Sequence, residues 1–212
     1  GGIIFYIDTL SPRIFIASLT DLSTTAKWGC FGTLIGGTSQ DIGTGQTNTL
    51  AIINGCSSSG IAAQLCNDLV IGPYNDWFLP SKDELHKVYL NIGQGSTTNI
   101  GGFINNDYWS SSEDGAHSAW MCDFALGGNE YANSKFYTRP IRPIRSIYFC
   151  LAISSISTGC TDPLACNYDP LATCDNGSCL TNFGCMDPTA CNYDSLATCD
   201  DGSCLTSSGC MD

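Results

Sequence analysis

A cysteine-rich phrase that returns every 25 residues constrains the fold more than any other feature of this sequence. The tract Gly159–Pro163 reads Gly-Cys-Thr-Asp-Pro, returns at Gly184–Pro188 as Gly-Cys-Met-Asp-Pro, and begins again at Gly209. Both complete copies space their cysteines as C-x5-C-x7-C-x4-C. Because a unit this short can bury almost no core, we expect disulfides to hold it together.

The abundance of cysteine indicates the compartment in which the protein works. Fourteen cysteines, nine of them in the last 53 residues, stand at fixed spacings in a Gly- and Asp-rich tract. This pattern favours disulfides, which persist in oxidising compartments, so the sequence predicts a secreted or cell-surface protein. A zinc site would require C-x2-C pairs or histidine partners, and the repeat tract has neither.

Charge and hydropathy argue against two classes of partner. Twenty acidic residues against 8 basic ones give a formal net charge of -12, whereas nucleic-acid binding needs clustered Lys and Arg. No run of the sequence approaches the roughly 18 apolar residues of a membrane span. We therefore expect no nucleic-acid partner and no membrane span in this segment.

Length and composition predict one ordinary domain followed by a small repeat array. We expect a domain over residues 1–150, a linker over 151–158, repeats over 159–183 and 184–208, and the start of a third repeat over 209–212. Since the third copy is incomplete, we expect the array to belong to a longer chain.

Within the first domain, residue patterns predict a mixture of strands and helices. Strands are expected over residues 3–7, 13–18, 108–112, 119–124, 136–138 and 141–147. Helices are expected over residues 48–54, 61–69 and 82–91, with a long ordered loop over 27–45. The clearest signal is Ser81 followed by Glu84, which predicts a capping box at the start of the third helix.

Several motifs of this domain, in this order, resemble bacterial surface domains of the DUF1566 or Lcl carboxy-terminal type. They are Gly2–Tyr6, Trp28–Cys30, Gly60–Ala63, Asp76–Ser81, Tyr108–Glu113 and Ile141–Arg145. The resemblance covers about residues 1–147 and implies an α+β, C-type-lectin-like fold. In such a fold the first and last strands pair, helices pack outside, and loops form an exposed binding face.

The resemblance also indicates where a ligand would bind. The sequence lacks the Glu-Pro-Asn or Gln-Pro-Asp tripeptide of calcium-dependent sugar-binding lectins, so we do not expect that mechanism. Loops over 105–113 and 127–137 are the expected ligand face, because Asn, Tyr, Trp and Ser offer adaptable contacts. The candidate ligand-binding residues are Asn105, Asn106, Tyr108, Trp109, Glu113, Asn129 and Tyr131. The alternative is that Trp77, Trp109 and Trp120 belong to the core.

Four cysteines per repeat allow three pairings. The repeat is similar to a short motif of bacterial extracellular proteins that often carries only the outer two cysteines, which implies nested disulfides here. The implied pairs are Cys160–Cys179, Cys166–Cys174, Cys185–Cys204 and Cys191–Cys199; the alternative joins Cys179 to Cys185 across the repeat boundary. In the first domain the sequence favours Cys30–Cys56, and the pairing of Cys66, Cys122, Cys150 and Cys210 stays open.

The acidic and amide residues of the repeats predict calcium binding, one Ca²⁺ ion per repeat. Oxygen ligands precede a glycine that permits a sharp turn, as a calcium loop requires, although the EF-hand spacing is absent. The candidate ligands are Asp162, Asn167, Asp169, Asp175, Asp187, Asn192, Asp194 and Asp200. The alternative is that these residues only form turns.

These features predict a non-enzymatic extracellular binding or adhesion module, with a lectin-like head on a disulfide- and calcium-stiffened repeat stalk. Its partner would be a surface glycan or a protein. The alternative from another class is a structural subunit that self-associates into a surface fibre or filament. Enzymatic activity is the weakest hypothesis, because His86 and His117 are the two histidines and no nucleophile motif accompanies them. The formylglycine-generating enzymes share the broad fold only, and a fold does not transfer an activity.

Overall fold

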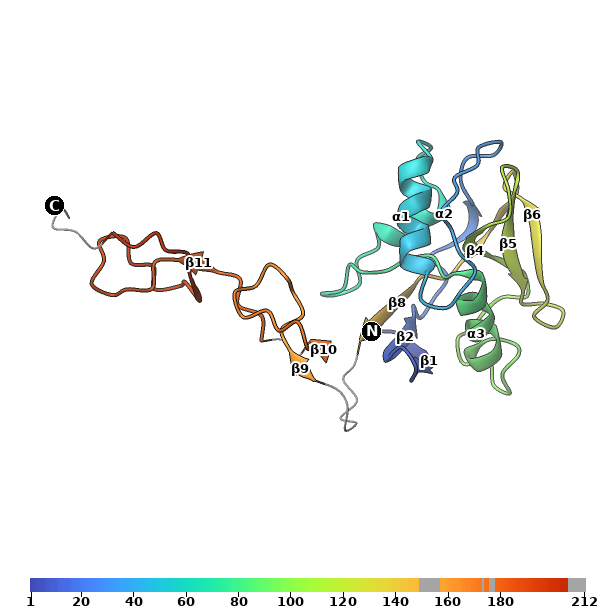
Figure 1. The fold of residues 1–212 in the computed structure, drawn as a ribbon. Helices are drawn as coiled ribbons and strands as arrows, with labels where there is room; N and C mark the ends of the chain where they lie inside the picture. Colours follow the sequence, from blue (N-terminus) through green and yellow to red (C-terminus); the bar gives the residue numbers. More distant parts are fainter. Residues whose placement is uncertain (149–156, 173, 176–177, 206–212) are drawn as a thin grey trace. The chain divides into compact units, whose positions relative to one another are not determined.

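The computed structural model describes residues 1–148, 157–172, 174–175 and 178–205. Most of the expected linker, the start of the third repeat, Cys150 and Cys210 lie outside these residues. The chain divides into two compact units, Gly1–Tyr148 and Phe149–Asp212. The first unit is a mixed α+β structure of small antiparallel sheets and a few helices, and the second is irregular and rich in disulfides (Figure 1).

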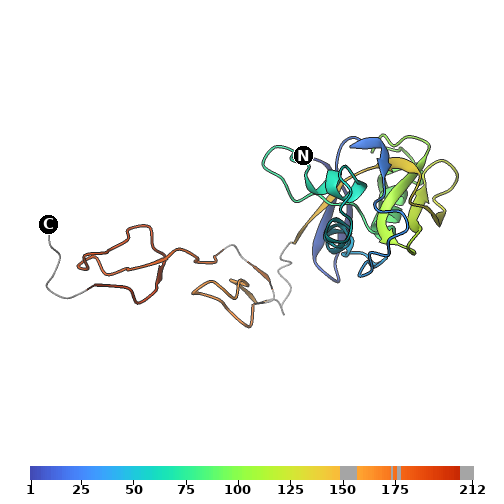
Figure 2. The same cartoon turned by 90° about the horizontal axis from the view of Figure 1, so that it is seen from above.

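The opening hairpin and the last strand of the first unit form one antiparallel sheet. Strands β1 (Ile3–Asp8), β2 (Arg13–Ala17) and β8 (Ile144–Tyr148) lie in the order β1-β2-β8, side by side in Figure 2. The Asp8 carboxylate accepts hydrogen bonds from the backbone N–H groups of Leu10 and Ser11, which closes the expected turn. The last strand therefore pairs with β2 and not, as expected, with the first strand, because β2 lies between them in the sheet.

Two further sheets complete the strand content of the first unit. Strand β3 (Ser23–Lys27) pairs with β7 (Thr138–Ile141), and β4 (Asp107–Glu113), β5 (Ser118–Asp123) and β6 (Glu130–Ser134) form an antiparallel sheet. Strands β3 and β6 are polar and were not predicted from the sequence.

The expected strand over 141–147 is two strands, β7 and β8, interrupted at Arg142 and Pro143. The Arg142 side chain is buried there, where it contacts the Asp21 carboxylate at 2.8 Å and donates to the backbone oxygens of Ser18 and Gly101. Proline has no N–H group to continue a ladder, so the chain changes sheets at this point.

The three expected helices are present as α1 (Gly45–Gly55), α2 (Ala62–Asn67) and α3 (Lys82–Ile92). Helix α3 has the predicted capping box: the Ser81 hydroxyl accepts from the Glu84 backbone N–H, and the Glu84 carboxylate accepts from the Ser81 backbone N–H at 2.7 Å. Its buried residues, Leu85, Val88 and Ile92, recur at helical spacing, so this face packs against β1, β4 and β5.

Strand β4 separates two hydrophobic clusters in the first unit. Neighbouring side chains of a strand point to opposite faces, so Tyr108 packs in a cluster with Phe15 while Trp109 packs in another with Trp28. Among the tryptophans that could be core residues, Trp77 and Trp109 are buried, whereas Trp120 is only half-buried. Cys66 and Cys122 are buried free thiols.

In the second unit the two repeats share one backbone pattern. The two-residue strands β9 (Thr158–Gly159) and β10 (Cys174–Asp175) pair in parallel, as do β11 (Phe183–Gly184) and β12 (Cys199–Asp200). The repeated glycine is needed for close packing. A side chain on Gly184 would meet the Ala197 Cβ and an Asp194 carboxylate oxygen, each at 3.1 Å, and Gly159 is equally crowded.

The outer cysteines of each repeat are joined to one another, but the inner ones are not. Disulfides link Cys160 to Cys179 and Cys185 to Cys204, and Cys30 to Cys56 in the first unit. The expected inner pairs, Cys166–Cys174 and Cys191–Cys199, are wrong, because Cys166 of the first repeat is bonded to Cys199 of the second. The alternative pair, Cys179–Cys185, is not formed either. Cys174 and Cys191 are disulfide-bonded as well.

The backbone explains why Cys166 meets Cys199. The connecting segment begins at Leu180, whose carbonyl accepts from the Cys166 backbone N–H at 3.1 Å and lies 3.1 Å from the Cys199 sulfur. Two residues later, the Asn182 carbonyl accepts from the backbone N–H groups of Thr198 and Cys199. The connecting segment thus runs between the two cysteines and brings them together.

Candidate functional site

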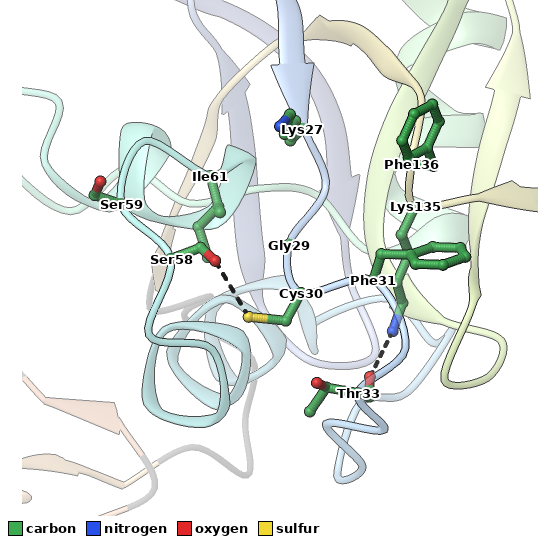
Figure 3. A pocket seen from close by; sticks show the side chains of 10 residues that line it. All are labelled: Lys27, Gly29, Cys30, Phe31, Thr33, Ser58, Ser59, Ile61, Lys135 and Phe136. Carbon is green, nitrogen blue, oxygen red and sulfur yellow. Dashed lines mark hydrogen bonds between the residues drawn. The ribbon is translucent and has the colours of Figure 1, made fainter.

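The first unit carries a pocket of about 390 Å³ whose walls come from distant parts of the chain. Its lining residues are Lys27, Gly29, Cys30, Phe31, Thr33, Ser58, Ser59, Ile61, Lys135 and Phe136. In Figure 3, Ser58, Ser59 and Ile61 form one wall, and the rings of Phe31 and Phe136 form the opposite wall.

A buried ion pair holds the aromatic wall in place. The Lys135 ammonium lies 2.5 Å from a Glu113 carboxylate oxygen, and both side chains are almost fully buried. The same ammonium donates to the backbone oxygens of Thr33 and Ala116 and lies 4.5 Å from the centre of the Trp28 ring. Lys135 directly precedes Phe136, so its buried ammonium fixes the backbone next to Phe136 to the loop that carries Phe31.

The Glu113 carboxylate in turn fixes the remainder of that loop. Its two oxygens accept hydrogen bonds from the backbone N–H groups of Ile35 and Gly36, at 2.9 and 2.8 Å. The Gly32 N–H donates to the Ala116 carbonyl, with the glycine at a φ of +85° that other residues rarely adopt. This loop is therefore ordered by buried polar contacts, although its own side chains are mostly exposed.

Fixed in this way, the aromatic side chains point outward. Phe31 is 52% exposed and Phe136 is 71% exposed, with their ring centres 6.2 Å apart in an edge-to-face arrangement. The His117 ring meets Phe31 at 4.9 Å, and Tyr137 meets Phe136 at 6.0 Å. These four side chains, Phe31, His117, Phe136 and Tyr137, form a continuous exposed group that we call the aromatic rim.

The opposite wall is fixed by a disulfide and a backbone bridge. Cys30 is bonded to Cys56, and its sulfur lies 3.5 Å from the Ser58 hydroxyl oxygen. Lys27 and Ile61 form a parallel β-bridge, which holds the start of α2 against the end of β3. The exposed hydroxyls of Ser58 and Ser59 and the exposed Lys27 side chain thus face the aromatic wall across a preformed cavity.

This arrangement suits binding of a small polar molecule with an apolar face. Ligand sites combine apolar and aromatic walls with a few placed polar groups, and exposed aromatic groups of this kind often mark interaction sites. The rings offer stacking surfaces, and the hydroxyls and the ammonium offer hydrogen bonds. His117 contributes its ring to the rim.

Three of the residues predicted to bind a ligand are part of the folded interior. Tyr108 is buried and donates its hydroxyl to the Asp21 carboxylate at 2.7 Å, and burial raises its pKa. Trp109 is buried and donates its ring N–H to the Ala26 carbonyl, and Glu113 makes the ion pair described above. The prediction that they lie on an exposed face is wrong, because core clusters cover both faces of β4.

The other four predicted residues are exposed but do not line the pocket. Asn105 accepts from the Gln94 amide, and Asn106 accepts from the next backbone N–H. Asn129 donates to the Leu126 carbonyl within the turn between β5 and β6. Tyr131 lies on β6, where partial burial and the Asp107 carboxylate raise its pKa to about 12.

Phe136 and Tyr137 lie within the expected ligand face over 127–137, but sequence reasoning did not name them as binding residues and missed Phe31 and His117, because the rim joins positions up to about a hundred residues apart. Phe31 stands in a Gly- and Thr-rich loop, and Phe136 and Tyr137 were predicted to begin a strand. Phe136 and Tyr137 form instead a turn between β6 and β7. The signal in the sequence that could have marked this wall is Lys135 directly before two aromatic residues, Phe136 and Tyr137.

Five of the eight predicted calcium ligands form local turns. One oxygen of Asp162, Asp169, Asp187 or Asp194 accepts the backbone N–H two residues later, and Asp200 does the same for Gly202. Asn167 and Asn192 bridge to the end of their own repeats, where they accept from Leu180 and Leu205. The Asp175 carboxylate lies beside the Cys179 sulfur.

The contacts of the five turn-forming aspartates are those of the turn-forming alternative. Within the residues that the structure describes, three or more His, Cys, Asp or Glu side chains do not converge into a metal-binding group. Calcium binding stays a prediction.

No protein-family model and no curated protein sequence matches this chain. The disulfides that join described cysteines place the protein in an oxidising compartment. In the described part of the chain, every helix is too short or too polar to cross a membrane.

Proposed function

We propose that the protein is an extracellular, non-enzymatic binding or adhesion module that takes a glycan in the pocket beneath the aromatic rim. The observation that carries this proposal is the pair of exposed rings, Phe31 and Phe136, held by a buried ion pair opposite a wall of hydroxyls. Exposing large rings to water is unfavourable, so a fold that fixes them outward has a use for them.

The proposal includes a C-type-lectin-like fold for the first unit and homology to the DUF1566 or Lcl carboxy-terminal domains. The ordered sequence motifs support this, as does the last strand β8 lying beside the opening hairpin with the helices outside the sheets. The proposed site is made by loops, which is where scaffolds usually carry binding residues.

In this proposal the second unit is a stalk. Its repeats are held by disulfides within and between copies, and calcium would stiffen them further by taking the carboxylate oxygens that the turns leave free. A secreted or cell-surface location follows from the same cysteines.

A glycan microarray tests the proposal. The native protein is expected to bind a defined set of glycans, and Phe136→Ala should lose most of that signal because it removes a stacking surface. Phe183→Ala is the matched control, since Phe183 is 51% exposed but lies in the repeats. An array without bound glycans, or equal signals from native protein and Phe136→Ala, would refute the proposal. Regular filaments in electron micrographs would favour the surface-fibre alternative.

A further inference from the structure

The disulfide between Cys166 and Cys199 has a consequence beyond holding two repeats together. The three described disulfides of the repeats close the spans 160–179, 166–199 and 185–204. Each span overlaps the next one. Every peptide bond from Cys160 to Cys204 therefore lies inside at least one closed loop.

The connecting segment is where this matters. Its peptide bonds from Leu180 to Gly184 lie after the first outer disulfide and before the second, so only the Cys166–Cys199 disulfide spans them among the described bonds. With nested pairing these bonds would be the weak points, because one cut there would separate the repeats. The exposed backbone of such connectors is also where proteases usually cut.

The backbone contacts indicate that the offset pairing is built into the repeat. In the first repeat, Cys166 donates to the Leu180 carbonyl and Leu180 donates to the Asn167 amide oxygen. The second repeat has the same two hydrogen bonds 25 residues later, between Cys191, Asn192 and Leu205. These two hydrogen bonds place the second cysteine of a repeat beside the segment that follows the repeat. Because both copies have them, they are a property of the repeat unit.

We propose that the repeat tract is a nick-tolerant tether, in which the second cysteine of one repeat is bonded to the third cysteine of the next. A single hydrolysed peptide bond between Cys160 and Cys204 leaves the two parts of the chain covalently joined. Tension along the chain passes through the disulfides as well as the backbone, so the connector cannot extend independently of its neighbours. This function suits a surface appendage exposed to proteases, and it does not depend on what the first unit binds.

A single engineered cleavage site tests the proposal. The chain has no Lys or Arg after Arg145, so Thr181→Arg creates one tryptic site in the tract. Thr181 is exposed, and the bond that follows it lies within the connecting segment. The native chain, digested in parallel, is the matched control that reports any cuts in the first unit.

After limited trypsin digestion, the Thr181→Arg protein is expected to gain the mass of one water and to stay one species without reductant. Reduction should then release the carboxy-terminal part. A non-reduced peptide map of the cut protein should contain the Cys166–Cys199 link. Release from the Thr181→Arg protein without reductant would overturn the proposal, and so would a non-reduced peptide map that lacks the Cys166–Cys199 link.

Discussion

Replacing Lys135 by methionine is the most informative perturbation of the candidate site, because one ammonium joins both loops of the aromatic wall. Methionine keeps the length of the side chain but removes three hydrogen bonds, to Glu113, Thr33 and Ala116. It also leaves the Glu113 carboxylate buried without its cation. Breaking a buried pair in this way typically costs about 3–5 kcal/mol.

The expected loss can be measured as a shift in melting temperature. A unit of the size of Gly1–Tyr148 loses roughly 2–4 °C per kcal/mol, so Lys135→Met should melt about 6 to 20 °C below the native protein in calorimetry. Lys27→Met is the matched control, because it removes an exposed lysine from the opposite wall and surface substitutions usually change stability little. Equal melting temperatures for the two variants would show that the buried pair does not hold the loops.

Four further predictions concern other parts of the fold. Burial raises the pKa of Glu84 to about 7, above its unfolded value of 4.5, so the folded state binds the proton more tightly between those pH values. The contribution of Glu84 to stability should therefore fall as the pH rises from 4.5 to 7, and the melting-temperature difference between native protein and Glu84→Gln should be larger at pH 5 than at pH 8; a pH-independent difference would contradict this. At neutral pH, Glu84→Gln should cost about 1–3 kcal/mol by leaving a buried backbone N–H without an acceptor, while Asp83→Asn, at an exposed first-turn position, should cost little in the same melts. Gly184→Ala places a methyl group against Ala197 and should cost about 1–3 kcal/mol and lower the yield of oxidatively refolded repeats, whereas Gly1→Ala meets nothing and should refold normally. If calcium binds the repeats, adding it to chelator-treated protein should raise the melting temperature of the second unit, and an unchanged value would leave the carboxylates as turn formers only.

Local signals in the sequence were sufficient where neighbouring residues determine the structure. Ser81 and Glu84 are three positions apart, so their reciprocal capping could be predicted without knowledge of the fold. The turn at Asp8 between two apolar runs is equally local. The disulfide between Cys30 and Cys56 agrees with the pair that the sequence favoured.

Features that depend on distant partners were beyond sequence reasoning. Strand β4 is buried on both faces, which cannot be read from Tyr108 and Trp109 alone because aromatic residues suit an exposed binding loop as well as a core. The Lys135–Glu113 ion pair joins positions 22 residues apart and determines where Phe136 points. In the repeats, equal spacings fit several cysteine pairings, and only the path of the connecting segment selects Cys199 as the partner of Cys166.

The central claim, that a ligand binds beneath the aromatic rim, is tested most directly by ¹⁹F nuclear magnetic resonance of protein labelled with fluorophenylalanine. The chain has nine phenylalanines, and of these Phe31 and Phe136 line the pocket. Titration with a glycan selected on the array should shift those two signals, assigned by substitution, and leave buried Phe15 and Phe124 unchanged. Shifts confined to other phenylalanines, with Phe31 and Phe136 unaffected at saturation, would contradict the claim.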